Sequence, residues 1–467
     1  CNPVNSRYSS RDLCPVLFMP TSALPDGSKA PRWLQKLYYT LKPLDYMATA
    51  RAQYGDVFNA PVIGNHPAVL FISHPVGLQY LFASDNQKIT SPPNQLMQTI
   101  VGDRSIFCLE GARHRRERKL LMPPFHRERM ASYGQLIVEL THARMAQLQP
   151  GDLVLARSLA QDISLEVILR VVFGLTDGDR FATLKPLLVQ FADCFQNLLI
   201  GLALFFPALQ KDWGPRSPWG YMQTVQRQMR EVLTAEIRDR RQQDTADKPD
   251  ILSLLMATRD EQGQPMTDAE LYDELITLLL AGHETTASAI AWTLYCLHRE
   301  PAIRTKLQAE LATLGPNPDP LAIVQQPYLT AVCNETLRLY PIAILTVPRE
   351  VREPLDLMGY HLEPGTRLYG CIYLTHRRPD LYPNPDQFNP DRFLDRQFTP
   401  YEFLPFGGGL RRCVGEALAQ FELKLVVATL ITHYRFSLAS TTPEIPQRRG
   451  VTLAPSKGVP LLFEGKV

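Results

Sequence analysis

Residues 406–415 read Phe406-Gly407-Gly408-Gly409-Leu410-Arg411-Arg412-Cys413-Val414-Gly415 and decide the fold predicted for this chain. Three consecutive glycines let the backbone approach a flat ligand closely, because glycine has no side chain. The run from Glu416 to Leu430 follows at once and predicts a helix. A helix N-terminus favours negative charge, so it would stabilise a thiolate on Cys413. The stretch therefore predicts a loop that presents one cysteine to a bound group.

Two other interpretations of residues 406–415 compete with this one. A glycine turn and a helix with a buried structural cysteine is the ordinary interpretation of a lone cysteine. A phosphate-binding glycine loop is the second, but no clear strand precedes the glycines, and Arg411 and Arg412 occupy the turn. We reject the phosphate loop and keep the structural cysteine as the alternative that an experiment must exclude.

The composition is that of an ordinary globular protein. The chain has 467 residues, of which 45% are hydrophobic and 21% charged, and its formal net charge is +2. A net charge this small gives no reason to expect nucleic acid as a partner. Length alone suggests about three domains, yet no long flexible stretch divides the chain. We therefore expect a lead-in at residues 1–32 and one large catalytic domain at residues 33–467.

Cysteine usage and hydropathy favour a protein of the cytoplasm without a transmembrane anchor. The cysteines are scattered and form no C-x-x-C pair, so neither a disulfide framework nor a zinc site is favoured. They are Cys1, Cys14, Cys108, Cys194, Cys296, Cys333, Cys371 and Cys413. The most apolar stretch, Leu198 to Leu209, contains Pro207 and is shorter than the ~20 residues of a membrane span. It predicts a buried or interfacial helix.

Helical periodicity dominates the sequence, and the expected sheet content is low. The apolar run Ala68 to Ser73 predicts one strand of a small sheet. Helices are predicted at Ile163 to Phe173, Tyr221 to Arg241 and Ala302 to Leu314. The predicted fold class is therefore mainly α with a small β-sheet region.

One predicted helix, from Met266 to Glu300, is much longer than the others. Thr267 and Glu270 form a capping box at its start, and Pro301 stops it. From Leu275 to Cys296 the helix is apolar nearly all round, which is typical of a helix that threads the middle of a protein. The polar residues inside this run then need an explanation.

Every specified position of the pattern F-x-x-G-x-R-x-C-x-G is matched at residues 406–415, and here the chain resembles the cytochrome P-450 family. The resemblance implies a single haem-enclosing domain with a long central helix, and a haem b whose iron is bound by Cys413. Thiolate donation favours cleavage of the O–O bond of O2. Arg411 would pair with a haem propionate. The other residues expected to contact the haem at this loop are Pro405, Phe406, Gly407, Gly415 and Ala419.

The long helix contains Ala281-Gly282-His283-Glu284-Thr285-Thr286, which resembles the family's oxygen-activation motif. The resemblance places Ala281 and Gly282 against the haem, with Gly282 leaving space beside the iron. The Thr285 hydroxyl would bond the carbonyl of Ala281, and Glu284 would deliver protons. A solvated patch on an exposed helix is the alternative, but the apolar surroundings argue against it. His283 is expected to point elsewhere and to be structural.

Two further motifs resemble the scaffold of the family. Glu335 and Arg338 match E-x-x-R, an ion pair on one helix face, although that spacing alone is weak evidence. The downstream run Phe388 to Phe393 matches F-x-P-x-R-F and adds Arg392. The resemblance implies that Glu335, Arg338 and Arg392 form a buried structural triad. This triad would fix the segment that leads to Cys413.

Three further residues are expected at the haem propionates. The basic stretch Gly111 to Phe125 resembles the family's G-x-x-W-x-x-x-R helix, with His114 in place of the tryptophan and Arg118 one turn later. Arg349 matches another propionate-pairing position of the family. The alternative for these residues is an ordinary solvated basic surface.

The substrate pocket is expected where the family places apolar stretches around the haem. Its expected residues are Ile106, Phe107, Ala281, Ile344, Leu345 and Thr346. The sequence is more closely similar to soluble cyanobacterial members, through LLMPPFHRERM, AGHETTASAIAW and RQFTPYEFLPFGGG. Relatives of that group act on fatty acids, alkanes and sesquiterpenes, so we expect hydroxylation of an unactivated carbon in such a substrate. Ordinary core packing is the alternative for each stretch.

The resemblance implies an external electron donor, because the sequence carries no flavin domain. We expect a ferredoxin or flavodoxin with its reductase, docked by Arg113, Arg115, Arg116 and Arg412 beside Cys413. We also expect a monomer. Two rival functions are a peroxide-driven peroxygenase and a non-catalytic haem sensor or carrier. The pair of Glu284 and Thr285 argues against both, because neither needs a route for proton delivery.

Overall fold

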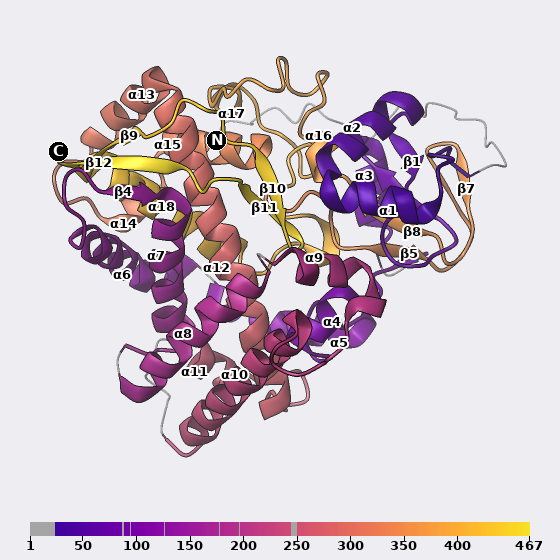
Figure 1. Cartoon of the computed structure of the whole chain (residues 1–467), viewed down its shortest axis with the longest axis horizontal. Coiled ribbons are helices and arrows are strands. Elements are labelled where there is room, and N and C mark those ends of the chain that lie inside the picture. The colour runs from indigo at the N-terminus through magenta and orange to yellow at the C-terminus, as the bar shows by residue number, and fades with distance from the viewer. Residues whose placement is uncertain are drawn as a thin grey trace, which may run out of the picture.

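The computed structural model describes residues 24–467 except 86, 87, 94, 126, 177, 196 and 244–249. Most of this chain is helical, which confirms the predicted fold class (Figure 1). The α-helices are α1 (Arg32–Leu41), α2 (Pro43–Tyr54), α3 (Pro75–Ala83), α4 (Gln95–Val101), α5 (Gly111–Leu121), α6 (Arg127–Met145), α7 (Ala156–Val171), α8 (Gly178–Cys194), α9 (Leu198–Phe205), α10 (Pro218–Arg241), α11 (Ile251–Ala257), α12 (Asp268–Arg299), α13 (Pro301–Ala312), α14 (Pro320–Val324), α15 (Pro327–Leu339), α16 (Ile372–Thr375), α17 (Arg392–Asp395) and α18 (Glu416–His433). Short 3-10 helices are η1 (Pro123–Phe125), η2 (Pro207–Leu209) and η3 (Gly409–Arg411).

The strands form small sheets beside the helical part. They are β1 (Val57–Asn59), β2 (Val69–Ile72), β3 (Ile89–Thr90), β4 (Leu153–Leu155), β5 (Arg349–Val351), β6 (Leu355–Leu357), β7 (Tyr360–Leu362), β8 (Arg367–Gly370), β9 (Tyr434–Leu438), β10 (Pro446–Arg449), β11 (Thr452–Pro455) and β12 (Pro460–Lys466). The largest sheet has the order β1-β2-β8-β5-β3, so it joins early and late parts of the chain. Its β2 pairs in parallel with β8, and all four residues of β2 are buried. The strand predicted at residues 68–73 is therefore confirmed.

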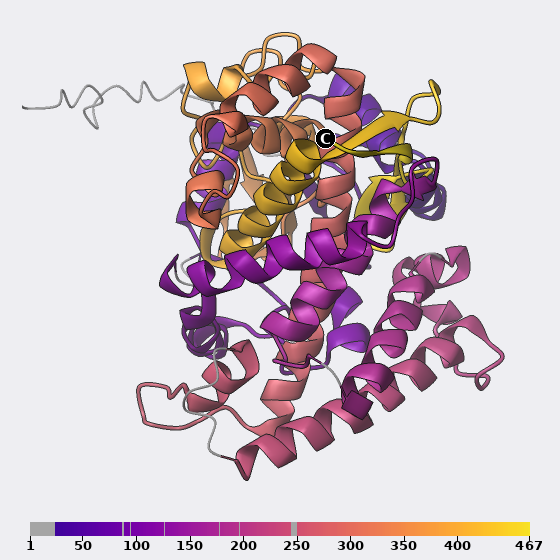
Figure 2. The ribbon, with the colours of Figure 1, turned by 90° about the vertical axis from the view of Figure 1, so that its left-hand side faces the viewer.

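The long helix predicted from residue 266 is α12, and it runs through the middle of the molecule (Figure 2). Thr267 caps it as predicted, because the Thr267 side chain accepts from the backbone N–H of Glu270 and the Glu270 side chain accepts from that of Thr267. Its flanks contact α7, α18, α15 and α10. This packing explains why its sequence is apolar nearly all round.

Some predicted boundaries differ from those observed. The helix predicted at Ile163 begins earlier, at Ala156, directly after β4. The stretch 198–209 is divided at Phe206 into α9 and η2, since Pro207 has no N–H to continue the helix. Residues 1–23 of the expected lead-in lie outside the described residues. Within residues 24–32, Gly27 already bridges to Asn59, and the division at residue 33 stays a prediction.

Within the described residues, no helix combines the length and the apolar character that crossing a membrane requires.

Candidate functional site

The glycine-rich loop is a tight turn that ends at α18. The N–H of Gly407 donates to the carbonyl of Leu404 (2.9 Å), and the N–H of Cys413 donates to the carbonyl of Phe406 (3.0 Å). Gly407 and Gly409 have φ values of +71° and +64°, a region that favours glycine. The chain then enters α18 with Gly415 as its N-cap residue. Cys413 therefore lies three residues before the first residue of the helix, as the sequence predicts.

Helix α3 and the residues after it hold this loop from behind, which the sequence did not reveal. A side chain at Gly408 would overlap the Phe82 ring, so only glycine fits there. The Asp85 carboxylate accepts from the N–H of Leu410 (3.1 Å). Phe82 and Asp85 are more than 320 positions from the loop in sequence, and no local pattern marks them. They fix the glycines in place.

Two other glycines of the loop have open space beside them. A Cβ atom added at Gly407 or at Gly415 would meet no atom within 4 Å. The Cys413 side chain is reachable by solvent, although it has many protein atoms around it. The surrounding protein atoms desolvate the Cys413 thiol and raise its pKa to about 11. A hydrogen bond from the N–H of Gly415 has the opposite effect and lowers the pKa. Binding to a metal ion would deprotonate such a thiol.

The middle of α12 is mostly buried but has partly accessible positions, among them Leu280 and Glu284. Leu278, Ala281, Gly282 and Thr285 are half-buried, and their spacing places them on one side of the helix. The Thr285 hydroxyl donates to the carbonyl of Ala281 (2.5 Å), as predicted. Helix α12 packs against α18, which begins three residues after Cys413.

The reason given for Gly282 needs correction. A Cβ atom there would lie 3.1 Å from Cδ1 of Ile168 on α7, so its missing side chain faces α7. The glycine lets the two helices approach closely. Its backbone stays a candidate neighbour of a bound group, but the space that the absent side chain leaves is taken by Ile168.

Glu284 lies between α12 and α7. Its two carboxylate oxygens accept from different side chains, Nη2 of Arg157 (2.5 Å) and Nε2 of Gln161 (2.6 Å). Arg157 is buried, with 5% of its surface exposed. The buried ring of His283 contacts the backbone carbonyl of Gln161 (3.1 Å), which fits its predicted structural role. Arg157 and Gln161 were missed because they resemble ordinary polar positions on a helix.

Arg411 lies near the loop and is held by backbone carbonyls rather than by a carboxylate. Arg411 donates to the backbone carbonyls of Ile106 (2.6 Å), Ser91 (2.9 Å) and Leu109. Among the described residues, no carboxylate lies within 4 Å of Arg411. Burial, and next the neighbouring Arg349, lowers the pKa of Arg411 to about 10.

His114 and Arg118 lie in the same positive region, on α5. Burial, and next the guanidinium groups of Arg411 and Arg118, lower the pKa of His114 to about 3. Nη1 of Arg118 donates to the carbonyl of Arg412 (2.6 Å), one residue before Cys413. An anionic ligand beside Arg411 and Arg118 would balance their charge, and the neutral His114 could donate an N–H to it.

Arg349 differs from the prediction, because its charge is already balanced. Its Nε and Nη2 atoms donate to the two oxygens of Asp85 (2.5 and 3.0 Å), and this pair is buried. Its Nη1 and Nη2 atoms also donate to the carbonyls of Val347 and Gly408. Four of the five N–H groups of the guanidinium are therefore used. Arg349 mainly clamps the glycine loop to β5 and keeps one N–H for a ligand.

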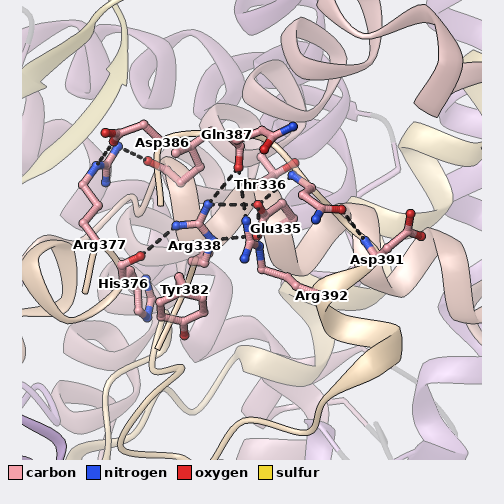
Figure 3. Close-up of polar contacts among 12 residues, drawn as sticks. Glu335, Thr336, Arg338, His376, Arg377, Tyr382, Asp386, Gln387, Asp391 and Arg392 are labelled. Carbon is pink, nitrogen blue, oxygen red and sulfur yellow. Dashed lines mark hydrogen bonds and ion pairs between the residues drawn. The ribbon is translucent and has the colours of Figure 1, made fainter. Parts of the chain in front are cut away.

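The ion pairs expected among Glu335, Arg338 and Arg392 are present (Figure 3). Arg338 approaches both oxygens of Glu335 (2.7 and 2.9 Å), and Nε of Arg392 lies 3.1 Å from Oε1. All three side chains are buried. Arg338 also donates to the carbonyl of His376 (2.8 Å). The triad thus ties α15 to the segment around residues 376–392.

The expected pocket residues divide into two groups. Phe107, Ala281 and Leu345 are half-buried, whereas Ile106 and Ile344 are buried in the core. Thr346 differs from the prediction, because its hydroxyl accepts from the N–H of Gly370 in β8 (2.9 Å) and is buried at 6% exposure. Thr346 therefore belongs to the sheet.

The Ile106 backbone joins two elements of the site. Its N–H donates to Oε1 of Glu274 on α12 (2.6 Å), and its carbonyl accepts from Arg411 (2.6 Å). Glu274 is fully buried and was missed, because a carboxylate in the predicted helix carried no recognisable motif.

The basic surface of α5 is smaller than predicted. Arg116 is bound by Asp260 (2.7 Å), Glu270 (3.2 Å) and Glu117 (3.3 Å), so it is not available to a partner. Arg412 makes two bonds to Glu416 (2.6 and 2.7 Å) but is half exposed. Arg113 and Arg115 are exposed.

The site fits a flat group that carries negative charge at its edge and a metal ion at its centre. Open space at Gly407 and Gly415 admits the flat face, and Cys413 supplies one thiolate ligand. Among the described residues, no group of three His, Cys, Asp or Glu side chains could hold a metal ion. These features are those of a haem-thiolate protein.

Comparison with known proteins agrees with this class. A sequence model of the family named cytochrome P450 matches residues 27–462. The chain is 32% identical over 444 residues to "Putative cytochrome P450 135A1" of Mycobacterium tuberculosis, covering 94% of this chain and 95% of the relative. It is also 32% identical to "Putative cytochrome P450 135B1" of Mycobacterium bovis, covering 93% and 90%. The chain belongs to the cytochrome P450 family.

A solved structure supports the fold. "Retinoic acid bound cyanobacterial CYP120A1" superposes with a TM-score of 0.84 at 25% identity, covering 96% of this chain and 100% of that one. As a cytochrome P450, the protein is a monooxygenase and an oxidoreductase that uses haem and O2. An apolar substrate and a redox partner are general requirements of this family.

Proposed function

We propose that this monooxygenase inserts one oxygen atom of O2 into an unactivated C–H bond of a fatty acid, alkane or sesquiterpene, with electrons from a ferredoxin-type donor. One observation carries the site assignment. The loop that presents Cys413 has open space at Gly407 and Gly415 and leads into α18, which packs against α12. This geometry supports Cys413 as the residue that would bind the iron of haem b.

The residues around Cys413 have separate roles in holding the haem. Arg411 and Arg118 supply positive charge for the propionates, His114 supplies an N–H group, and Arg349 makes a smaller contribution. The residues proposed to contact the ring are Pro405, Phe406, Gly407, Gly415, Ala419, Ala281 and Gly282. Asp85 and Phe82 act behind the loop and position it.

When bound, the haem supplies the iron at which O2 is reduced and the C–H bond is oxidised. The chain's own task is to bring protons to a dry interior. The Thr285 hydroxyl, held on the carbonyl of Ala281, presents a proton donor on the accessible face of α12. Glu284 would supply Thr285 from the side of α7. To do so its carboxylate must leave Arg157 or Gln161, which hold it at 2.5 and 2.6 Å.

The half-buried apolar side chains support an apolar substrate. Phe107, Leu345 and Ala281 are the proposed contacts, with Ile106 and Ile344 packed behind them. The cyanobacterial neighbour was solved with bound retinoic acid, an apolar acid. This supports a long apolar substrate here, and a spin-state titration with fatty acids, alkanes and sesquiterpenes would identify its class.

The proposed docking surface for the electron donor consists of Arg113, Arg115 and Arg412. Arg113 and Arg115 are exposed on α5, and Arg412 adjoins Cys413. Replacing Arg113 and Arg115 with glutamate should slow reduction by an acidic ferredoxin, most strongly at low ionic strength. A matched change at Arg435 and Lys466, exposed on β9 and β12, should leave the rate unchanged. Equal rates in both variants would contradict this surface.

The function is tested by the absorption spectrum of the reduced protein with carbon monoxide. Thiolate ligation gives a strongly red-shifted Soret band, and this band should disappear in Cys413→His. A parent that purifies without haem, or a histidine-type band that the substitution does not alter, would return Cys413 to the role of a structural cysteine.

A further inference from the structure

Helix α1 exposes its apolar face to solvent. The exposed fractions are 64% for Trp33, 43% for Leu34, 40% for Tyr38 and 55% for Leu41. Leu34, Tyr38 and Leu41 share one side of the helix, since they are four, three and seven residues apart, and Trp33 lies beside Leu34 and eight residues before Leu41. A surface helix normally buries its apolar side and exposes its polar side. In α1 these four large apolar side chains are exposed, whereas the polar Gln35 and Thr40 are buried together with Tyr39.

Hydrogen bonds hold the polar side of α1 against the protein. The buried Gln35 side chain donates to the carbonyls of Ser28 (3.0 Å) and Ala30 (2.7 Å) and accepts from the hydroxyl of Tyr46 (3.0 Å). The buried Thr40 hydroxyl donates to the carbonyl of Lys36 (2.7 Å). The orientation of α1 is therefore specified by its inner face.

The apolar surface continues onto α9 and η2. Helix α9 contacts α1, and the two lie side by side in Figure 1. Leu199 on α9 is 56% exposed, and Leu209 at the end of η2 is 50% exposed. We define the outer patch as Trp33, Leu34, Tyr38, Leu41, Leu199 and Leu209.

The tryptophans of the chain differ in a way that points to the same region. Trp219 and Trp292 are buried, whereas Trp33 and Trp213 are 64% and 77% exposed. Trp213 follows η2 by four residues, with Nζ of Lys211 6.0 Å from the centre of its ring. Exposed tryptophan next to lysine is typical of proteins at a membrane–water boundary.

A basic hollow lies beside the outer patch. Its volume is about 150 Å³, and Arg32, Trp33, Lys36, His66 and Phe206 are among its walls. None of the residues that line it is acidic. Nζ of Lys36 lies 3.4 Å from the carbonyl of Gly64 and 5.5 Å from the centre of the Phe206 ring. Among the described residues, no carboxylate lies within 4 Å of Arg32 or Lys36, so the hollow suits an anion.

The charges of the surrounding segments have the same sign. Segments 26–45 and 206–217 contain six basic residues, which are Lys29, Arg32, Lys36, Lys42, Lys211 and Arg216. The same segments contain three acidic residues, which are Asp26, Asp45 and Asp212. An apolar surface bordered by positive charge complements an anionic lipid surface.

We propose that the outer patch and the basic hollow together bind the surface of an anionic lipid bilayer. The apolar side chains enter the boundary between headgroups and acyl chains, and Arg32 and Lys36 receive a lipid phosphate in the hollow. The contact is peripheral, along the side of α1. It does not rest on the proposed function, because binding to a membrane is measured without turnover or haem chemistry.

The test is flotation of the full haem-loaded chain with lipid vesicles. The parent is expected to float with vesicles of phosphatidylglycerol and much less with vesicles of phosphatidylcholine. Replacing Trp33, Leu34 and Leu41 with serine should weaken flotation about tenfold or more, because the apolar contact is lost. The matched control replaces Leu153, Leu394 and Ile445, which are 67%, 47% and 63% exposed elsewhere, and should float like the parent.

Two further variants locate the contact. Arg32→Glu with Lys36→Glu should remove most of the preference for phosphatidylglycerol, because the hollow then repels phosphate. Tryptophan fluorescence should shift to the blue when the parent binds vesicles, because Trp33 enters an apolar environment. Trp33→Phe should still float with the vesicles, but its fluorescence shift should be smaller.

Three results would overturn the proposal. The parent could fail to float with either vesicle, or the Trp33, Leu34 and Leu41 variant could float as the parent does. The parent could also sediment as a dimer that the same variant converts to a monomer. That last result would identify a second copy of the chain as the occupant of the patch.

Discussion

Glu284 has two partners on α7, and this has consequences for proton delivery. Arg157 and Gln161 each hold one oxygen of its carboxylate, and both come from the first turns of that helix. The Thr285 hydroxyl next to it is bonded to the carbonyl of Ala281. In this arrangement the two neighbouring residues point to different partners. Proton transfer between them therefore requires the Glu284 side chain to move, whereas Thr285 is already in place.

Thr285→Ala should uncouple electron use from product formation. The alanine cannot hold a proton at the Ala281 carbonyl, so reduced oxygen would leave as peroxide. We expect the fraction of electrons recovered in product to fall at least about tenfold. Product and peroxide are measured for each equivalent of reductant. Thr285→Ser retains the hydroxyl and should keep most of the coupling, and equal coupling in the alanine variant and the parent would contradict the role.

Arg157→Ala should destabilise the fold through Glu284. The substitution removes the cation that pairs with the Glu284 carboxylate, whose side chain is only 15% exposed. Breaking a buried ion pair costs about 3 kcal/mol of folding stability. The free energy of unfolding is measured with denaturant. In a double-mutant cycle, Glu284→Gln in the Arg157→Ala background should cost less than in the parent by about 1 kcal/mol or more. Additive effects would show that the pair contributes nothing to stability.

At the scale of single elements, the contact between α12 and α7 has the clearest structural cause. Gly282 faces Ile168, and a methyl group at 3.1 Å would force that side chain to shift. A glycine inside a helix is unfavourable by about 1 kcal/mol relative to alanine. Its presence in the middle of α12 is therefore explained by the close approach of α7.

Gly282→Ala tests this contact when it is combined with Ile168→Val. Alone, the alanine gains helix propensity and loses packing, so its net effect on unfolding should be small. The valine removes the methyl group nearest to the new Cβ atom. We therefore expect the pair to be more stable than the sum of the single changes by about 0.5–1 kcal/mol. Denaturant unfolding of the four proteins measures this coupling, and a value of zero would place Ile168 out of reach.

Some of these elements could be predicted from the sequence, because their causes are local. The capping box of Thr267 and Glu270 and the apolar content of α12 involve neighbouring positions. The spacing of Glu335 and Arg338 likewise predicts their ion pair. In motifs of this kind both interacting residues lie within a few positions of each other, so the sequence shows the interaction directly.

Other features could not be predicted, because their causes are distant in sequence. Arg349 stands at a sequence position where the family places an arginine for a haem propionate. In the structure it pairs with Asp85, which lies 264 positions earlier in the sequence and could not be paired with it by any local pattern. The apolar side of α1 looks like any core-facing helix until Gln35 and Thr40 are seen to be buried. Sequence periodicity shows that a helix is two-sided, but it does not show which side the protein covers.

The whole molecule encloses carboxyl groups that affect its stability as pH changes. Glu422 on α18 is 2% exposed. Burial raises the pKa of Glu422 to about 8, against a smaller opposing effect of the Ser164 hydroxyl. Burial, followed by the neighbouring Glu270, raises the pKa of Glu117 to about 7. The buried His114 and His298, with pKa values lowered to about 3 and about 4, act in the opposite sense, but only below about pH 6.5.

Glu422→Gln should therefore flatten the decline of stability at neutral pH. The folded chain keeps a proton on Glu422 that the unfolded chain releases above about pH 4.5, so this group stabilises the fold less as pH rises. Its contribution falls by about 1.4 kcal/mol per pH unit until about pH 8 and is constant above that. The free energy of unfolding of the haem-loaded protein is measured between about pH 6.5 and 9. Glutamine copies the neutral acid, so the variant should lose that part of the slope, whereas Glu464→Gln at an exposed position should follow the parent. A parent and a Glu422→Gln variant with the same slope would mean that Glu422 is already ionised in the folded protein.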